Sequence, residues 1–444
     1  MVFPLLPFMI PLYYLSMITS KQVIATYYSI TALYTLSVSI IWGINTLFLM
    51  NAGLDIFQVM VVNALFTAGM VIFEVPTGVV ADTIGRKVSF LLCISVLFVT
   101  TLLYVAAADF GWGFWAFCSI SVLIGLGFTF FTGAVEAWLV DALNRTGYDR
   151  PLERVFARGQ AVFSAAMLIG SVGGGLLGQI HLSWPYMARA ALLVPTFFIS
   201  LLLMKDLGFE SRPLTFSNFG GEAREILLDG IKYGWNQPVL RLCMLAAFIE
   251  GLFFIYGWYS WQRYFLDLLA RELVWVAGIV AALMSVSMII GNAIVGKLST
   301  DASRRPGILV VNSVVRATTI LAAGLLGALT PPEGRGVGVF SVVVLLYLIF
   351  GLSFGISNPI RMALVNRHIP SARRATVLSV DSLFNEGGGV VGQTGLGYLS
   401  RSVSIPIAWI VGGAVLYLGY PLYRKVGKVE AELEEMGRGD AKTR

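Results

Sequence analysis

The stretch GVVADTIGRK, residues 78–87, separates two long apolar segments with glycines and charges. Gly78 has no side chain to hold neighbouring helices apart, and Gly85 permits a tight turn. Asp82 supplies an anion suited to the N-terminus of another helix, and Arg86 follows it by four residues. The pattern predicts two membrane helices joined by a short charged turn.

The composition around this stretch is that of a membrane protein. The 444 residues are 57% hydrophobic and 13% charged, whereas soluble domains carry about 25% charged residues. Apolar runs of about 20 residues recur along the chain, and the short alternating segments of a membrane β-barrel do not. The net charge of +6 is spread over short connectors, which argues against nucleic-acid binding.

Hydropathy predicts twelve membrane-spanning helices. Their expected ranges are 24–49, 57–80, 88–108, 112–140, 156–181, 184–204, 239–267, 273–297, 307–330, 337–366, 373–400 and 403–424. The chain is therefore predicted to divide into an apolar N-terminal segment at the membrane interface (1–23), a six-helix bundle (24–204), a cytoplasmic linker (205–238), a second bundle (239–424) and a charged, frayed cytoplasmic tail (425–444).

The linker contains a candidate amphipathic helix. Ile226, Leu227 and Ile231 fall on one helical face. The opposite face carries Arg224, Asp229 and Lys232. This pattern is typical of a helix lying on the membrane surface, and a solvated linker helix is the alternative.

The basic residues predict the orientation. Most of the 31 lysines and arginines lie in connectors on the side that holds both termini. The exceptions are Arg189, Arg263, Arg271, Arg335 and Arg401 on the other side and Arg316 within a span. The positive-inside rule therefore predicts a multi-pass protein of an inner (plasma) membrane with both termini in the cytoplasm.

The two halves of the chain echo one another. The LVD of 139–141 matches the LVN of 364–366, and the glycine-rich run of 170–178 resembles 386–397. Parallel six-helix repeats are one architecture of secondary transporters, with the substrate site at the repeat interface near the middle of the membrane. We therefore expect an all-α fold of twelve transmembrane helices built as two six-helix pseudo-repeats.

The opening stretch resembles the signature G-x-x-x-D-x-x-G-R-K that lies between the second and third spans of the major facilitator superfamily. Every key position is filled, by Gly78, Asp82, Gly85, Arg86 and Lys87. The end of the fourth span, residues 132–143, looks like that of drug-efflux-like members. A glycine-rich fifth span resembles the antiporter signature only faintly, because no proline follows the glycines; close helix packing is the alternative explanation.

The resemblance implies a transporter that works by alternating access and is not an enzyme. It also implies a charge relay of Asp82, Arg86 and Asp141 that latches the cytoplasmic ends of the two halves when the cavity faces outward. Asp82 is expected to face the start of the eleventh span, near Arg373 and Arg374.

Charges inside membrane spans are costly and mark functional sites. Four such carboxylates are candidates for proton coupling: Glu136, Glu250, Asp381 and Glu386. Glu250, deep in the seventh span, is the first choice. The repeat places Glu136 opposite Arg361, either as a gate or substrate contact across the cavity or as a static ion pair. Arg316 needs a carboxylate partner, which the sequence does not identify.

The candidate substrate-binding residues come from the spans that line the cavity in this fold. They are Trp42, Asn45, Phe254, Tyr256, Asn358 and Arg361. Aromatic faces beside a carboxylate suit an apolar or cationic organic substrate, although outer aromatic residues also form interfacial belts. The three cysteines, Cys93, Cys118 and Cys243, lack metal-ligand spacing, and the chain contains no nucleotide-binding loop. We expect no metal and no cofactor.

The predicted function is proton-coupled export of small amphipathic or hydrophobic compounds by a monomer. Its partners are a small-molecule substrate, a proton or other ion gradient and membrane lipid. One alternative is a transporter of a defined metabolite, such as a sugar, a lipid or a siderophore. The other is a membrane receptor that uses the same fold without moving a substrate.

Overall fold

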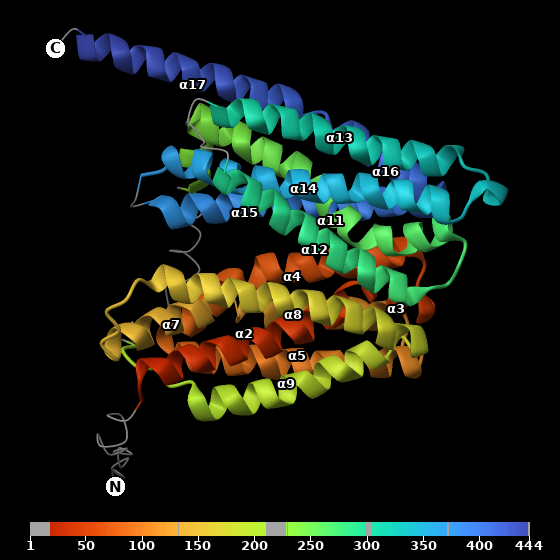
Figure 1. Cartoon of the computed structure of the whole chain (residues 1–444), viewed down its shortest axis with the longest axis horizontal. Helices are drawn as coiled ribbons and strands as arrows, with labels where there is room; N and C mark the ends of the chain where they lie inside the picture. Colours follow the sequence, from red (N-terminus) through yellow and green to blue (C-terminus); the bar gives the residue numbers. More distant parts are fainter. Residues whose placement is uncertain are drawn as a thin grey trace.

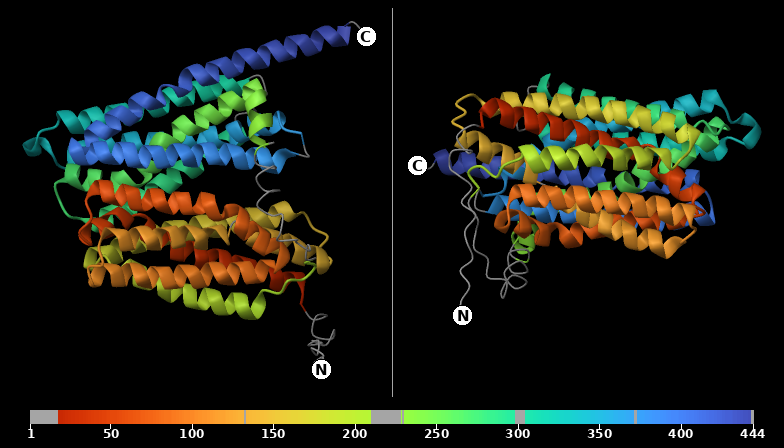
Figure 2. Two further views of the ribbon diagram at one scale, coloured as in Figure 1. Left: turned by 180° about the vertical axis from the view of Figure 1, so that it is seen from behind. Right: turned by 90° about the horizontal axis from the view of Figure 1, so that it is seen from below.

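The computed structural model describes residues 18–131, 133–209, 228, 230–297, 304–370 and 373–442, and within these ranges the chain forms helices and no strand. The first half contains α2 (Ser20–Trp42), α3 (Asn45–Asn51), α4 (Ile56–Thr83), α5 (Arg86–Asp109), α6 (Phe114–Thr129), α7 (Ala134–Arg145), α8 (Leu152–Ile180) and α9 (Trp184–Leu203). These helices form one layer of the molecule, and the second half forms the other (Figures 1 and 2).

The second half contains α11 (Pro238–Leu269), α12 (Val274–Lys297), α13 (Arg305–Leu329), the short 3₁₀ helix η2 (Pro332–Gly334), α14 (Val337–Arg367), α15 (Arg374–Ser402), α16 (Ile405–Leu416) and α17 (Gly419–Lys442). Among the described residues, eleven helical segments are long and apolar enough to span a membrane. α15 occupies the place of the eleventh predicted span but carries more polar residues. The all-α architecture with two groups of spans is therefore confirmed.

Helix starts follow from local sequence. Asp55 precedes α4, and its carboxylate accepts a hydrogen bond from the backbone N–H of Gln58 at 3.0 Å. The side chain of Gln58 in turn accepts from the N–H of Asp55 at 3.0 Å. This reciprocal capping satisfies backbone donors that a helix start leaves unpaired. Thr19 and Gln22 cap α2 in the same way.

Two predicted spans are broken at points that bend the chain. The fourth span divides into α6 and α7 where Gly133 adopts a left-handed conformation with φ 71°. A side chain at this position would be strained. The first span divides into α2 and α3 at residues 43–44, which directs α3 and its Asn45 toward the neighbouring helices.

Small residues bring α8 onto α2. A Cβ atom built on Gly174 would stand 1.8 Å from the carbonyl oxygen of Ile40, and one built on Gly170 would meet the Ser39 hydroxyl. The glycines of the fifth span therefore permit close helix packing, as one of the two sequence interpretations predicts.

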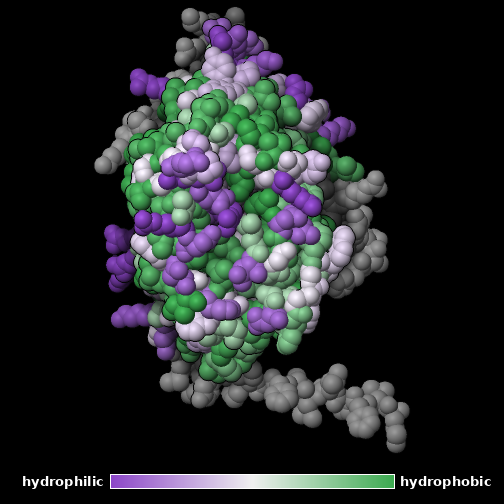
Figure 3. All heavy atoms as spheres, turned by 90° about the vertical axis from the view of Figure 1, so that its right-hand side faces the viewer, coloured by the Kyte–Doolittle hydropathy of each residue, from purple (hydrophilic) through white to green (hydrophobic). Residues whose placement is uncertain are grey.

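The two halves touch at the end of the bundle that lies away from the start of α2. Gly175 of α8 lies against Gly278 of α12. The carboxylate of Asp55 in the first half forms an ion pair with Arg401 in the second half at 3.4 Å. The hydroxyl of Thr46 donates to the carbonyl of Tyr259 at 2.8 Å. The surface of this end mixes hydrophilic residues with hydrophobic ones (Figure 3).

Toward the other end, the halves diverge. Gln160 of α8 and Asn292 of α12 line a cavity of about 410 Å³ between the halves, on the same two helices that touch at Gly175 and Gly278. On α4, a Cβ built on Gly78 would meet no atom within 4 Å. The protein is therefore open toward the end at which α2 begins and α14 ends.

Two sequence predictions about connectors have different outcomes. The charged tail is not frayed over its described length, because α17 continues as a helix to Lys442. Val426 is buried, and Glu430 lies 3.2 Å from the ring of His368, so this helix has a packed face. Most of the predicted linker helix, the first seventeen residues and Asp301, the repeat partner of Asp82, lie outside the described residues.

Candidate functional site

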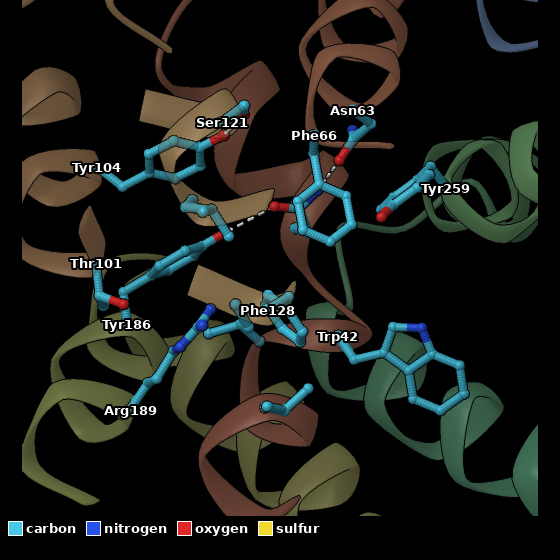
Figure 4. Close-up of a pocket in the computed structure, with 14 residues that line it drawn as sticks. Trp42, Asn63, Phe66, Thr101, Tyr104, Ser121, Phe128, Tyr186, Arg189 and Tyr259 are labelled. Atoms are coloured by element: carbon cyan, nitrogen blue, oxygen red, sulfur yellow. Dashed lines mark hydrogen bonds between the residues drawn. The ribbon is translucent and has the colours of Figure 1, made fainter. Parts of the chain in front are cut away.

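A small cavity lies within the first half. Its volume is about 110 Å³, and its wall combines aromatic rings with amides and hydroxyls. Six helices of the first half and one residue of α11 contribute to it. Trp42, Asn45, Asn63, Phe66, Thr101, Tyr104, Ser121, Phe128, Tyr186, Arg189 and Tyr259 are among the lining residues (Figure 4). We call this the Arg189 pocket.

A hydrogen-bond network orders one wall of the Arg189 pocket. The amide of Asn45 donates to the side-chain oxygen of Asn63 at 3.0 Å. The hydroxyl of Tyr186 donates to the side-chain oxygen of Asn45 at 2.8 Å. The hydroxyls of Tyr104 and Ser121 form a second hydrogen bond. These side chains are thereby held in fixed orientations around the cavity.

Arg189 is the one cation in this lining. Its side chain points from α9 into the pocket, beside Phe128 (Figure 4). The residue is 2% exposed, and the guanidinium carbon lies 5.9 Å from the centre of the Phe128 ring. The buried Nε and Nη2 atoms have no hydrogen-bond partner among the described residues. The sequence groups this arginine with the basic residues of the non-cytoplasmic side, and the structure buries it within α9.

Trp42 lines both the Arg189 pocket and the cavity between the halves. Its ring lies 4.4 Å from that of Trp258, centre to centre. The larger cavity also receives Phe354, which stacks on Phe254 at 4.2 Å. Asn358 lines it from α14. Three of the predicted substrate-binding residues, Trp42, Phe254 and Asn358, thus lie at or beside this cavity.

A second polar cavity, of about 240 Å³, lies within the second half. Glu250 accepts from Arg316 at 2.6 Å and from the Tyr423 hydroxyl at 2.8 Å. Arg361 donates to Asp381 at 2.5 Å. Two carboxylates and two arginines therefore form two ion pairs in this cavity. Glu250 is the carboxylate partner that the sequence did not identify for Arg316. Glu250 and Asp381 are therefore both held in ion pairs in this conformation.

Glu386 has a different environment. It lies on α15, half-buried, and the described part of the chain gives it neither a hydrogen bond nor an ion pair. Another carboxylate, Glu74, belongs to α4, the helix of the opposite half that packs against α15. Two like charges on helices that pack together are costly when both are ionised and close to each other.

The charged turn of residues 78–87 is partly as predicted. Asp82 and Arg86 form an ion pair at 2.8 Å. Gly85 has φ 123°, so the tight turn needs glycine. A Cβ built on Gly78 would meet no atom of the described residues within 4 Å, so the close helix approach predicted for this glycine is not made in this conformation.

The carboxylate that joins this turn is Asp206 rather than Asp141. Asp206 accepts a hydrogen bond from the backbone N–H of Lys87 at 3.0 Å. The Lys87 ammonium donates to the carbonyl of Leu201 at 2.7 Å. Asp141 lies nearby on α7, without an ion pair to Arg86 in the described ranges. The proposed relay therefore stops at Arg86 in this conformation.

Other predicted site residues lie apart from the cavities. Tyr256 is fully buried in the second half, where its hydroxyl contacts Ser400 at 2.6 Å, so its burial makes it a core residue and not a substrate contact. Glu136 is exposed on α7. Its repeat partner Arg361 is instead paired with Asp381. The Glu136–Arg361 attraction is absent in this conformation because these residues belong to halves that diverge.

Sequence reasoning missed Arg189, Glu74 and Asp206. Arg189 and Glu74 carried a usable signal, because each is a charge within an otherwise apolar helix. Asp206 carried none, since its partner Lys87 is 119 residues away.

Comparison with known proteins agrees with this geometry. The family model of the Major Facilitator Superfamily matches residues 27–393, with a second match over 266–439. The chain belongs to the Major Facilitator Superfamily. It is therefore a multi-pass membrane transporter by family, and not an enzyme.

Curated relatives of this superfamily member include an uncharacterised MFS-type transporter, YxaM, of Bacillus subtilis (strain 168). It is 22% identical over 91% of this chain and 96% of its own length. The class C tetracycline resistance protein of Escherichia coli is 26% identical over 67% of this chain and 71% of its own length. The tetracycline resistance protein supports the predicted drug-efflux-like branch.

Solved structures show the same fold. The nucleoside transporter NupG matches with a TM-score of 0.71 and 14% identity, covering 92% of this chain and 98% of NupG. A POT family transporter in complex with a thioalcohol-conjugated peptide matches with a TM-score of 0.69 and 13% identity, covering 90% and 94%. At these identities the likeness concerns the fold alone.

Proposed function

We propose that this protein is a proton-coupled exporter of small amphipathic compounds that works by alternating access. The proposal extends the family assignment by a direction, a coupling ion and a substrate class. The tetracycline resistance protein among its relatives supports export of an amphipathic compound. We place the transporter, as a monomer, in an inner (plasma) membrane with both termini in the cytoplasm, following its basic connectors.

We assign proton coupling to Glu386 and propose that Glu74 is the carboxylate that acts on it from the other half. The observation that carries this step is the pairing state of the buried carboxylates. Glu250 and Asp381 each hold an arginine. Glu386 has no arginine partner among the described residues, and Glu74 lies on α4, which packs against α15 from the opposite half. Approach of the halves brings the two like charges together and favours binding of a proton, and separation favours its release.

Alternating access requires that the two ends of the bundle open in turn. The described conformation is closed at Gly175 and Gly278 and open at Gly78. In the opposite conformation, Gly78 is free to receive a helix of the other half, because it carries no side chain. The Asp82–Arg86 pair at the adjacent turn then acts as the latch. This supports a rocking motion of one half against the other.

The test uses purified protein reconstituted in vesicles that enclose the pH dye pyranine. Addition of tetracycline should produce a change in internal pH that requires the protein. Glu386→Gln should abolish the proton movement, since an amide cannot exchange a proton. Glu333→Gln, an exposed carboxylate in η2, serves as the matched control and should behave as the wild type.

A wild-type proton signal in Glu386→Gln overturns the coupling assignment. Tetracycline uptake without any proton signal overturns proton coupling itself and favours a uniporter of a defined metabolite. Glu250→Gln gives a further comparison, because loss of coupling in that variant alone would return the role to the seventh span.

A further inference from the structure

We propose that the Arg189 pocket binds the anionic group of an organic substrate, so that the cargo is an amphipathic organic anion. This inference rests on the proposed transport function and narrows its substrate class. The pocket supplies one buried cation and a wall of aromatic rings, and it shares Trp42 with the larger cavity.

The buried guanidinium of Arg189 has no counter-ion in the described part of the chain. Arg189 is 2% exposed, and its Nε and Nη2 atoms have no hydrogen-bond partner within the described ranges. The ionisable groups that act most strongly on it are Tyr34, Tyr186, Tyr104 and Cys93, which are phenols and a thiol rather than carboxylates. An unpaired buried cation is costly and is retained where a ligand pairs with it.

The second half provides the contrast. Its two buried arginines each hold a carboxylate, Arg316 at 2.6 Å and Arg361 at 2.5 Å. The chain thus neutralises its cations where they serve the fold. Arg316 and Arg361 also line a cavity, but Arg189 differs from both because the described part of the chain gives it no carboxylate partner where it enters its pocket (Figure 4). Arginine presents planar, paired donors that match carboxylate, sulfonate and phosphate groups.

The shape of the pocket defines the rest of the ligand. A volume of about 110 Å³ accommodates a charged group and one ring. Phe66 and Phe128 supply aromatic faces, and Asn45 and Asn63 supply amide groups at the wall. Trp42 lines both this pocket and the cavity of about 410 Å³ between the halves, so the two cavities are neighbours. A ligand larger than the pocket would reach that cavity by displacing the Trp42 side chain.

The experiment measures binding and needs no transport. Naphthalene-2-carboxylate and its neutral isostere naphthalene-2-carboxamide are titrated calorimetrically into the protein in detergent micelles. The wild type should bind the carboxylate on the order of tenfold more tightly than the carboxamide. Arg189→Gln should remove this preference, and Arg189→Lys should retain part of it. Arg335→Gln, an exposed arginine at the end of the bundle, is the matched control.

A second readout separates ligand binding from a structural role. Without ligand, Arg189→Gln should unfold at the same temperature as the wild type or a higher one, because it removes an unpaired buried charge. A structural arginine would give a lower unfolding temperature. If Arg189→Gln does not fold, the charge-retaining Arg189→Lys still tests the carboxylate preference.

Three outcomes overturn the inference. They are equal affinity for the two isosteres in the wild type, an unchanged preference in Arg189→Gln, and exclusive binding of a short-chain phosphatidylglycerol, which would assign the pocket to a lipid headgroup. A carboxylate preference without any flux would leave the anion site standing and remove the proposed function. Proton-coupled flux that is unchanged in Arg189→Gln would leave the proposed function standing and remove the anion site.

Discussion

Gly175 of α8 lies so close to Gly278 of α12 that a Cβ atom built on Gly175 would stand 2.7 Å from the Cα atom of Gly278. Backbone meets backbone at this point, so neither helix can give way by turning a side chain. The contact joins the two halves at one end of the bundle while they diverge at the other. It therefore holds the conformation that the structure displays.

Gly175→Ala should shift the protein away from this conformation. Overpacking of this kind costs about 1–3 kcal/mol, and separation of the halves at this end relieves it. A cysteine pair at Gln160 and Asn292, which line the opposite walls of the cavity, reports the result. Cross-linking of this pair should increase as the open end closes. The three native cysteines are buried and do not interfere.

Gly173→Ala is the control for this prediction. A Cβ built on Gly173 meets no atom within 4 Å, although it lies on the same helix. Equal cross-linking in the two alanine variants would show that the glycine contact does not set the conformation.

Asp82→Asn should lower transport without lowering stability. The Asp82–Arg86 pair is 2.8 Å long and partly exposed, and such pairs are worth about 0–1 kcal/mol. The unfolding temperature should therefore stay close to that of the wild type. Flux into vesicles should decrease, because the latch of the opposite conformation is lost.

The pair Arg263–Asp267 supplies the matched control for the latch. It has the same four-residue spacing, a distance of 2.7 Å and similar exposure, and it lies at the opposite end of the bundle. Asp267→Asn should leave flux unchanged. A normal rate in Asp82→Asn would refute the role of the charged turn.

Glu250→Gln should destabilise the fold strongly. It leaves Arg316 buried without its 2.6 Å partner, and breaking a buried pair costs about 3–5 kcal/mol. Removal of both charges in Glu250→Gln/Arg316→Gln should recover much of this loss. Thermal unfolding in detergent measures the cycle. Additive effects of the two substitutions would contradict the pairing.

Asp206 should give a pH-dependent contribution to stability. Burial raises the pKa of the Asp206 carboxyl above 3.8, although the hydrogen bond from Lys87 and nearby cations oppose the shift. The folded protein therefore binds this proton more tightly than the unfolded chain. The contribution of Asp206 to the free energy of unfolding should therefore increase as the pH falls. The increase occurs between the raised pKa of the folded protein and the ordinary pKa of the unfolded chain.

Variants of Asp206 separate the charge from the hydrogen bond. Asp206→Asn keeps an acceptor for the Lys87 N–H and should lose the pH dependence. Asp206→Ala should lose about 1 kcal/mol of stability at neutral pH, as loss of a helix cap does. Unfolding temperatures measured in neutral and mildly acidic buffers give the comparison. Identical pH profiles for wild type and Asp206→Asn would contradict the assignment.

The sequence by itself determined the architecture. Runs of about twenty apolar residues predict spans, because backbone groups in a membrane must bond within a helix. The residues of 78–87 resemble the signature of the superfamily, and the family match confirms the membership that this resemblance implies. Gly85 was correctly predicted to form a turn, since its φ of 123° is a local property of the chain.

The tertiary structure alone decided which charges meet. Glu250 pairs with Arg316 across 66 positions, and Asp206 joins Lys87 across 119. Periodicity within one helix carries no information about which helix lies opposite. For the same reason the sequence did not identify Arg189 as a pocket residue. The sequence shows only a cation near the start of a predicted span. Only the packing of six helices of the first half shows that its side chain faces a cavity and that its Nε and Nη2 atoms lack a partner among the described residues.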